Sequence, residues 1–109
     1  MTAQVHAINC IEVPAGFEEV AIAVREEYIN YFRKQPGFVS STFYRASSSR
    51  DAINFVNIVV WASEEAYNAV VNVGFGDAEG ENADGMKVLG KGFPPPIVVH
   101  PGLYRVIGS

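Results

Sequence analysis

The apolar and polar positions along the chain follow two different periods. Four segments, residues 4–13, 38–46, 52–62 and 97–107, carry runs of β-branched and aromatic side chains that are typical of strands. Residues 16–34 instead place apolar side chains at the i, i+3, i+4, i+7 spacing of an amphipathic helix. The apolar stripe of this predicted helix consists of Phe17, Val20, Ala21, Val24, Tyr28, Tyr31 and Phe32. Its outer face is expected to carry Glu18, Glu19, Arg25, Glu26, Glu27, Arg33 and Lys34.

A second, shorter helix is predicted from Ser63 to about Val73. Ser63 is a favourable N-cap residue, and the acidic pair Glu64 and Glu65 suits the positive end of a helix dipole. The segment that follows, residues 74–96, is rich in glycine and ends in consecutive prolines. We therefore expect a long loop there, which is either functional or mobile.

The predicted order of elements, strand–helix–strand–strand–helix–strand, is that of the ferredoxin-like α+β fold. In this fold a four-stranded antiparallel sheet carries two helices on one face. We expect a single domain over residues 1–109. Pro101 favours an edge position for the last strand, because proline has no N–H group to donate to a neighbouring strand.

The third predicted strand, residues 52–62, is apolar on both faces. One face carries Ile53, Phe55, Val59 and Trp61, and the other carries Val56, Ile58 and Val60. The two helices cover only one face of the sheet, so the other face needs a different cover. We expect a second copy of the chain there, giving a homodimer in which two sheets form a closed α+β barrel.

The composition narrows the classes of partner and site. The formal net charge is −4 and the eight basic residues are scattered, so neither nucleic acid nor a membrane surface is an expected partner. The single Cys10 permits no internal disulfide, and the two histidines and one cysteine are not at zinc-binding spacing, so no metal site is expected. The sequence shows neither a signal-peptide pattern nor a membrane-spanning apolar run, and we expect a cytoplasmic protein.

Two hydrogen-bond donors lie in line on the third predicted strand. With a side-chain period of two, Asn57 and Trp61 point to the same face, and both are suited to binding a carbonyl oxygen or an oxyanion. Asn9 is a lone amide in an otherwise apolar row of the first strand, and Tyr67 of the second helix is a candidate for proton transfer. Plainer roles stay open, because Trp61 and Tyr67 also suit core packing and the two asparagines could bond each other or a water.

Further candidates surround these donors. Aromatic side chains of the first helix and the third strand could line an apolar binding site for a planar ligand. His100 is a candidate general base, although a solvated or dimer-contacting histidine is the alternative. The predicted substrate-binding residues are Asn9, Tyr28, Phe32, Phe55 and His100.

Three stretches make the chain similar to a known family. They are the opening I-N-C-I-E-V-P-A-G at residues 8–16, the P-G-F turn at residues 36–38, and the strand-to-helix junction from Asn57 to Tyr67. Over nearly its whole length the chain resembles the antibiotic biosynthesis monooxygenase family of dimeric α+β barrels. The resemblance implies oxidation of a small aromatic phenolic or quinol-type substrate by O2 with neither flavin nor metal, so that no cofactor is expected. It also implies that Asn57, Trp61 and Tyr67 line the substrate cavity as catalytic residues.

Two departures from the family pattern bear on the ligand. An arginine that lines the family's cavity lies after the second helix, whereas residues 81–86 contain no arginine and only Lys87 and Lys91 are nearby. Haem-degrading relatives share the fold but need a tryptophan and a histidine where this chain has Val70 and Gly80. Haem is therefore not an expected ligand.

Two other classes of function compete with the monooxygenase. One is an isomerase or a lactone-processing or signal-degrading member of the same barrel superfamily, in which His100 would matter more. The other is a small-molecule-binding dimer without turnover. Consumption of O2 distinguishes the monooxygenase from both.

Overall fold

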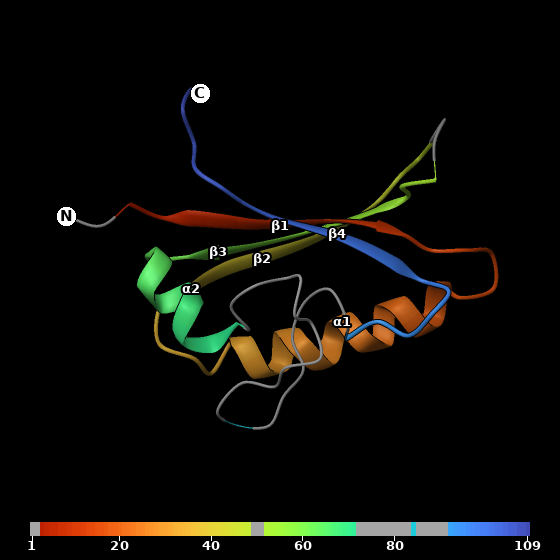
Figure 1. Ribbon diagram of the computed structural model, residues 1–109, viewed down its shortest axis with the longest axis horizontal. Helices are drawn as coiled ribbons and strands as arrows, with labels where there is room; N and C mark the ends of the chain where they lie inside the picture. Colours follow the sequence, from red (N-terminus) through yellow and green to blue (C-terminus); the bar gives the residue numbers. More distant parts are fainter. Residues whose placement is uncertain (1–2, 49–51, 72–83, 85–91) are drawn as a thin grey trace.

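The computed structural model describes residues 3–48, 52–71, 84 and 92–109, and its elements follow the predicted order (Figure 1). The strands are β1 (Val5–Glu12), β2 (Phe38–Arg45), β3 (Phe55–Trp61) and β4 (Val98–Tyr104), and the helices are α1 (Glu18–Phe32) and α2 (Glu64–Val70). The elements are somewhat shorter than the predicted segments, which extend beyond them at the ends. Most of the predicted loop at residues 74–96 lies outside the described residues.

The sheet is antiparallel throughout and has the order β2-β3-β1-β4. Both helices lie on the same side of it (Figure 1), which is the ferredoxin-like arrangement predicted from the sequence. β4 is an edge strand, as Pro101 predicts, since an edge strand needs no N–H group on its outer side. Neither helix is long and apolar enough to cross a membrane in the part of the chain that the structure describes.

Helix α1 packs on the sheet with most of the predicted stripe, but Val20 departs from it. Ala21, Ile29 and Phe32 are buried, whereas Val20 is 39% exposed. The buried line therefore follows the i, i+4, i+8 spacing that begins at Ala21, and the residue in the middle of this line is Arg25. The prediction that Val20 points inward and Arg25 outward is wrong, because the helix is rotated toward the Ala21–Ile29 line.

The junction between β3 and α2 forms as predicted. The Ser63 side chain caps α2, its Oγ accepting a hydrogen bond from the Ala66 backbone N–H at 3.1 Å. The Gly37 carbonyl accepts a bond of 2.7 Å from the Ala62 N–H, which ties the turn after α1 to this junction. Gly37 has a φ of +87°, and a Cβ there would lie 2.4 Å from the Ala66 Cβ, so the turn requires glycine.

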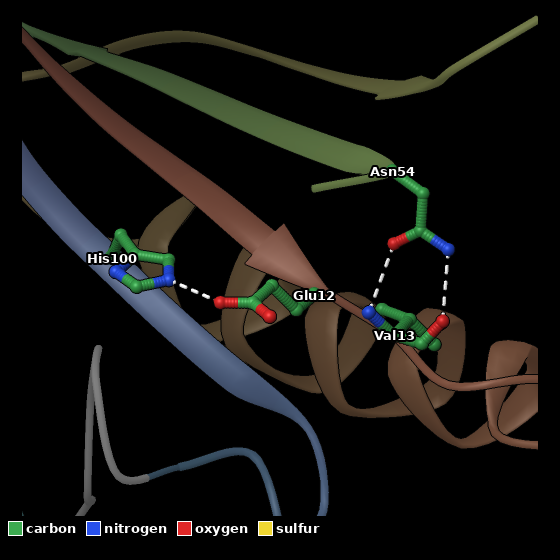
Figure 2. Close-up of polar contacts among 4 residues, drawn as sticks. All are labelled: Glu12, Val13, Asn54 and His100. Atoms are coloured by element: carbon green, nitrogen blue, oxygen red, sulfur yellow. Dashed lines mark hydrogen bonds and ion pairs between the residues drawn. The ribbon is translucent and has the colours of Figure 1, made fainter. Parts of the chain in front are cut away.

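Asn54, just before β3, fastens the other end of the sheet. Its side-chain amide makes two hydrogen bonds with the backbone of Val13 (Figure 2): Oδ1 accepts from the N–H at 2.9 Å and Nδ2 donates to the carbonyl at 2.8 Å. Its backbone N–H donates to the Ile11 carbonyl at 3.0 Å, and its carbonyl accepts from the Ala46 N–H at 2.8 Å. These contacts hold the end of β1 against the start of β3.

The core between helices and sheet divides into two clusters. One consists of Val5, Ala7, Ile29, Phe32, Val59, Trp61, Tyr67, Val70 and Val71, and the other of Ile11, Val13, Ala21, Phe55, Phe93 and Ile97. Along β1 the buried position between the two clusters is Asn9, and along β3 it is Asn57. A polar layer therefore interrupts the core in the middle of the sheet, which sets the place of the candidate site.

Candidate functional site

Asn9 and Asn57 form a polar row on the helix-facing side of the sheet. They are direct partners in the β1–β3 register, and only 2% of Asn9 and 7% of Asn57 is exposed. Their outer neighbours in the same row are Pro101 of β4 and Phe43 of β2. Burying two adjacent amides in a core costs free energy unless their polar atoms form hydrogen bonds. The hydrogen-bond partner of each amide atom therefore indicates whether the pair serves the fold or a ligand.

Arg25 of α1 completes this row from the helix side. Its Nε donates a hydrogen bond of 3.1 Å to Asn57 Oδ1, and its guanidinium carbon lies 5.1 Å from the centroid of the Phe43 ring. Polarity alone places Arg25 on the outer face of α1, and this prediction is wrong. The signal in the sequence is its spacing, four residues after Ala21 and four before Ile29, both of which are buried.

The bond from Arg25 also decides how the Asn57 amide is oriented. A guanidinium has only donors, so the atom that faces it must be the amide oxygen. The Nδ2 group of Asn57 is then turned away from the arginine. Asn57 therefore offers an N–H donor, rather than an acceptor, to a group bound beside it.

Two buried polar atoms of this side of the sheet lack a hydrogen-bond partner. Among the residues that the structure describes, Asn9 Oδ1 and Trp61 Nε1 have none, and Trp61 is 0% exposed. Most buried polar atoms in proteins are paired, and leaving one unpaired costs about 1–3 kcal/mol. A polar ligand bound on this side of the sheet could supply the missing hydrogen bonds to this acceptor and this donor.

Trp61 and Asn57 stand at different places along β3. With a rise of about 3.3 Å per residue, their Cα atoms are about 13 Å apart, so they do not converge on a single atom of a small ligand. Tyr67 of α2 belongs to the same cluster as Trp61. The site thus has two polar ends, one at the Asn9–Asn57 row and one at Trp61, which suits an elongated molecule with oxygens at both ends.

The comparison with protein families gives the assignment. The model of the family described as antibiotic biosynthesis monooxygenase matches residues 4–72, which is more than half of the chain and includes β1, α1, β2, β3 and α2. The chain belongs to the antibiotic biosynthesis monooxygenase family.

Solved structures of similar proteins agree with this family. A monooxygenase candidate from Shewanella loihica is 27% identical with a TM-score of 0.71, and the match covers 100% of this chain and 99% of that one. SnoaB, a cofactor-independent oxygenase from Streptomyces nogalater, is 19% identical with a TM-score of 0.66, over 99% and 97% of the two chains. A haem-degrading protein from Mycobacterium tuberculosis is 20% identical with a TM-score of 0.63, over 100% and 97%. A search of curated proteins finds no match.

In this family member, aromatic side chains link the two core clusters on the helix-facing side. Trp61 lies edge-on to Phe32 with ring centroids 5.4 Å apart, Phe32 stacks on Tyr28 at 6.3 Å, and Tyr28 meets Phe93 edge-on at 6.1 Å. Phe55, another predicted contact, is buried in the second cluster. The structure thus brings together on the helix-facing side seven of the predicted site residues, namely Asn9, Tyr28, Phe32, Phe55, Asn57, Trp61 and Tyr67.

The two tyrosines of the site are held in their neutral form. Burial, with a smaller effect of the Glu27 charge, raises the pKa of Tyr28 to about 12. Burial alone raises the pKa of Tyr67 well above its ordinary value of 10.0. Both hydroxyls are therefore protonated at neutral pH, where they can donate hydrogen bonds but are poor bases.

His100 is the predicted site residue that the structure places elsewhere. Its partner in the β1 register is Cys10, so it lies on the sheet face away from the helices, and its Nε2 is 2.5 Å from Glu12 Oε2 (Figure 2). His6, the other histidine of the chain, lies on that face too. Lys87 and Lys91 lie outside the described residues, and among the described residues no three His, Cys, Asp or Glu side chains gather as a metal site would need.

Proposed function

We propose that the protein is a cofactor-independent monooxygenase that oxidises a small phenolic or quinol-type aromatic substrate with O2. The observation that supports this most is that two buried polar atoms, Asn9 Oδ1 and Trp61 Nε1, have no hydrogen-bond partner among the described residues. They lie on the side of the sheet that also carries the contacting rings of Trp61, Phe32 and Tyr28. Family membership and the likeness to SnoaB, an oxygenase of this kind, support the same reaction.

The chemistry places its main demand on the substrate. Ground-state O2 reacts slowly with closed-shell molecules, so the ring must be electron-rich, as a phenolate or enolate is. In the proposed reaction the phenol first loses its proton to solvent. O2 then forms a C–O bond at a ring carbon that carries hydrogen, giving a hydroperoxide, and loss of water leaves a carbonyl. One oxygen atom enters the product, the other leaves as water, and the ring supplies all the electrons that O2 takes up.

The protein's contribution is orientation and stabilisation of developing charge. The Nδ2 group of Asn57 and the indole N–H of Trp61 are donors for the oxygens at the two ends of the substrate. Tyr67, which burial keeps protonated at neutral pH, donates a hydrogen bond rather than removing a proton. Tyr28, Phe32 and Phe55 contact the flat rings.

Haem is the alternative ligand suggested by the haem-degrading neighbour. Both histidines of the chain, His6 and His100, lie on the sheet face opposite the helices, so the helix-facing side has no histidine to ligate iron. The residues therefore do not fit haem on that side. A titration with haemin is expected to give no Soret band of a ligated haem.

The homodimer and a cytoplasmic location are part of the same proposal. The sheet face away from the helices carries the half-buried side chains of β1 and β3, including Ile8, Val56, Ile58 and Val60. A second copy packed there would bury them, as the sequence predicts for a closed barrel. Light scattering at micromolar concentration should give the mass of a dimer, and a monomer would refute it.

Oxygen uptake tests the reaction. Metal-stripped protein is supplied with anthrones, naphthols and hydroquinones, and O2 consumption is followed together with incorporation of label from ¹⁸O2. We expect uptake with at least one substrate, one labelled oxygen in the product, and a sharp decrease in the Trp61→Phe variant. An isomerase or a binding protein would consume no O2, and the latter would show only a shift in melting temperature with ligand.

A further inference from the structure

Arg25 makes no ion pair within the described part of the chain, although the charge of its neighbour Glu26 partly offsets the effect of burial on its pKa. The ion pairs found there join His100 with Glu12 and Arg105 with Glu64, and neither involves Arg25. Desolvation of the guanidinium is the main effect that lowers the pKa of Arg25, yet an arginine stays protonated at neutral pH. A half-buried cation that has no ion-pair partner among the described residues favours the binding of an anion.

The contacts of Arg25 fix the guanidinium at the polar row. Its Nε is used by Asn57 Oδ1, and Phe43 packs against the guanidinium, so the side chain is held from two sides. The two Nη nitrogens are the remaining donors of the fork, and a fork of this shape is suited to carboxylate or phenolate oxygens. The Nδ2 group of Asn57 is a further donor at the same place.

We propose that Arg25, together with the Asn57 amide N–H, forms an anion-binding end of the site that selects an aromatic substrate with a phenolate or carboxylate oxygen. Asn9 Oδ1, unpaired among the described residues and in register with Asn57, accepts a hydrogen bond from an O–H group on the same end of the ligand. The inference rests on the proposed function, which gives the place of the substrate. It adds that the substrate is negatively charged and that Arg25 binds this charge.

The charge also explains how a phenol is ionised on a sheet face without a histidine. A cation next to a bound phenol stabilises its anion and lowers its pKa, so the proton passes to solvent more readily. The phenolate left behind is the form that gives electrons to O2. Arg25 in addition positions the Asn57 amide, because the bond to Oδ1 holds Nδ2 toward the ligand.

Anaerobic binding of two isosteric probes tests the inference apart from any turnover. The probes are 2-naphthoate and 2-naphthamide, which have the same rings and differ in the charge of the group that stands in for the phenolate. Binding is followed by quenching of the fluorescence of the single tryptophan, Trp61. We expect wild type to prefer the naphthoate by about tenfold or more, as a hydrogen bond to a charged group predicts.

Variants of two arginines on the same segment supply the matched control. Arg25→Met keeps an aliphatic contact with Phe43 but removes the charge, and its preference should fall to within about twofold. Arg25→Lys should retain part of the preference, because it keeps the charge without the fork. Arg33→Met removes an equal charge from the exposed end of α1 and should leave the preference unchanged. Thermal unfolding by circular dichroism verifies that each variant is folded.

The outcomes separate this inference from the proposed function. Equal affinities for the two probes in wild type, undetectable binding of both, or a preference that survives in Arg25→Met would each overturn the anion-binding role. O2 uptake in wild type together with equal affinities would overturn only the role of Arg25. A naphthoate preference that depends on Arg25, with no uptake across the substrate panel, would support the anion site and overturn the monooxygenase proposal.

Discussion

Asn54 and Asn57 are three residues apart in the sequence and show two different uses of the same side chain. Both amide atoms of Asn54 are bonded to the backbone of Val13, at 2.9 and 2.8 Å, where β1 meets β3. Asn57 lies in the buried middle of the sheet, accepts one bond from Arg25, and is next to Asn9, whose oxygen has no partner among the described residues. An amide whose bonds are all made within the fold indicates stability, whereas buried amides with unmet atoms indicate a ligand.

The two faces of the sheet show the same contrast. On the face away from the helices, His100 and Glu12 bond each other and remain partly open to solvent (Figure 2), so neither needs another partner. On the helix-facing side, polar atoms are buried and only partly paired. One atom of the other face, His6 Nδ1, is also buried without a partner among the described residues, and it lies where the second copy of the chain is expected. The difference supports the proposal that the site lies on the helix-facing side.

The largest effect is expected for loss of the donor at the polar row. Asn57→Ala should lower kcat/KM about a hundredfold, close to 3 kcal/mol of transition-state stabilisation, because one donor to a developing oxyanion is removed. Steady-state O2 uptake measures this. Asn54→Ala is the control and should retain kcat/KM at a temperature where it is folded, and an equal loss in both variants would remove the distinction between the two asparagines.

The second largest effect is expected on stability, and here Asn54 rather than Asn57 is the residue whose loss has the effect. Asn54→Ala should lower the free energy of unfolding by about 2 kcal/mol, because two hydrogen bonds are lost and the backbone groups of Val13 lose their partners. Urea denaturation measures this, with the exposed Asn30→Ala on α1 as control, where a change within about 0.5 kcal/mol is expected. An Asn54→Ala variant as stable as wild type would show that the two hydrogen bonds to Val13 do not contribute to stability.

A smaller effect of opposite sign is expected at Asn9. Asn9→Val removes a buried acceptor that has no partner among the described residues and places a good strand former in β1, so the free energy of unfolding should rise by about 1 kcal/mol. Ligand affinity should fall in the same variant, as is usual when a functional residue is exchanged for a stabilising one. Urea denaturation and fluorescence titration report the two quantities, and a clear loss of stability would mean that the amide serves the fold.

Alkaline pH tests the buried tyrosine of the aromatic surround. The pKa of Tyr28 is raised to about 12 in the folded state from 10.0, so above pH 10 the unfolded chain releases its proton first. Stability is therefore fully present below pH 10 and is lost between about pH 10 and 12. Tyr67 acts in the same direction. Urea midpoints at pH 9, 10 and 11 should decrease, less steeply in Tyr28→Phe, and identical slopes in the two proteins would contradict this.

The smallest effect is expected for His100, on the sheet face away from the helices. His100→Gln should change kcat/KM by less than about twofold, because His100 lies across the sheet from the site. O2 uptake tests this. A large loss of activity would favour the isomerase alternative, in which His100 is a base.

The fold was predictable from the sequence because periodicity and turn chemistry agree at each element. Ser63 caps α2, Pro101 lies in an edge strand, and Asn57 and Trp61 share the buried face of β3. These features are local, so a single segment of sequence contains the signal for each. The proximity of Asn9 to Asn57 also follows once β1 is known to pair with β3, although the register itself needs the structure.

The role of Arg25 was not predicted, because polarity assigns an arginine to the outer face of a helix. Its spacing from Ala21 and Ile29 contains the correct information, but an apolar stripe that begins at Val20 fits the same helix. Packing against the sheet decides between the two rotations. Hydrogen-bond satisfaction is likewise a tertiary property, so the paired amide of Asn54 and the unmet oxygen of Asn9 could not be told apart from sequence alone.

The most direct test of the ligand site is the NMR signal of the indole N–H of Trp61, which is unique because the chain has one tryptophan. The ¹⁵N-labelled protein is titrated anaerobically with 2,6-dihydroxynaphthalene, which has an oxygen at each end, and with 2-naphthol, which lacks the second oxygen. If the indole N–H binds the oxygen at the far end of the substrate, 2,6-dihydroxynaphthalene should move the indole proton downfield and slow its exchange with solvent, whereas 2-naphthol should have a clearly smaller effect. Saturation with 2,6-dihydroxynaphthalene, seen as shifts of other resonances, while the indole signal stays in place would contradict the assignment of this site.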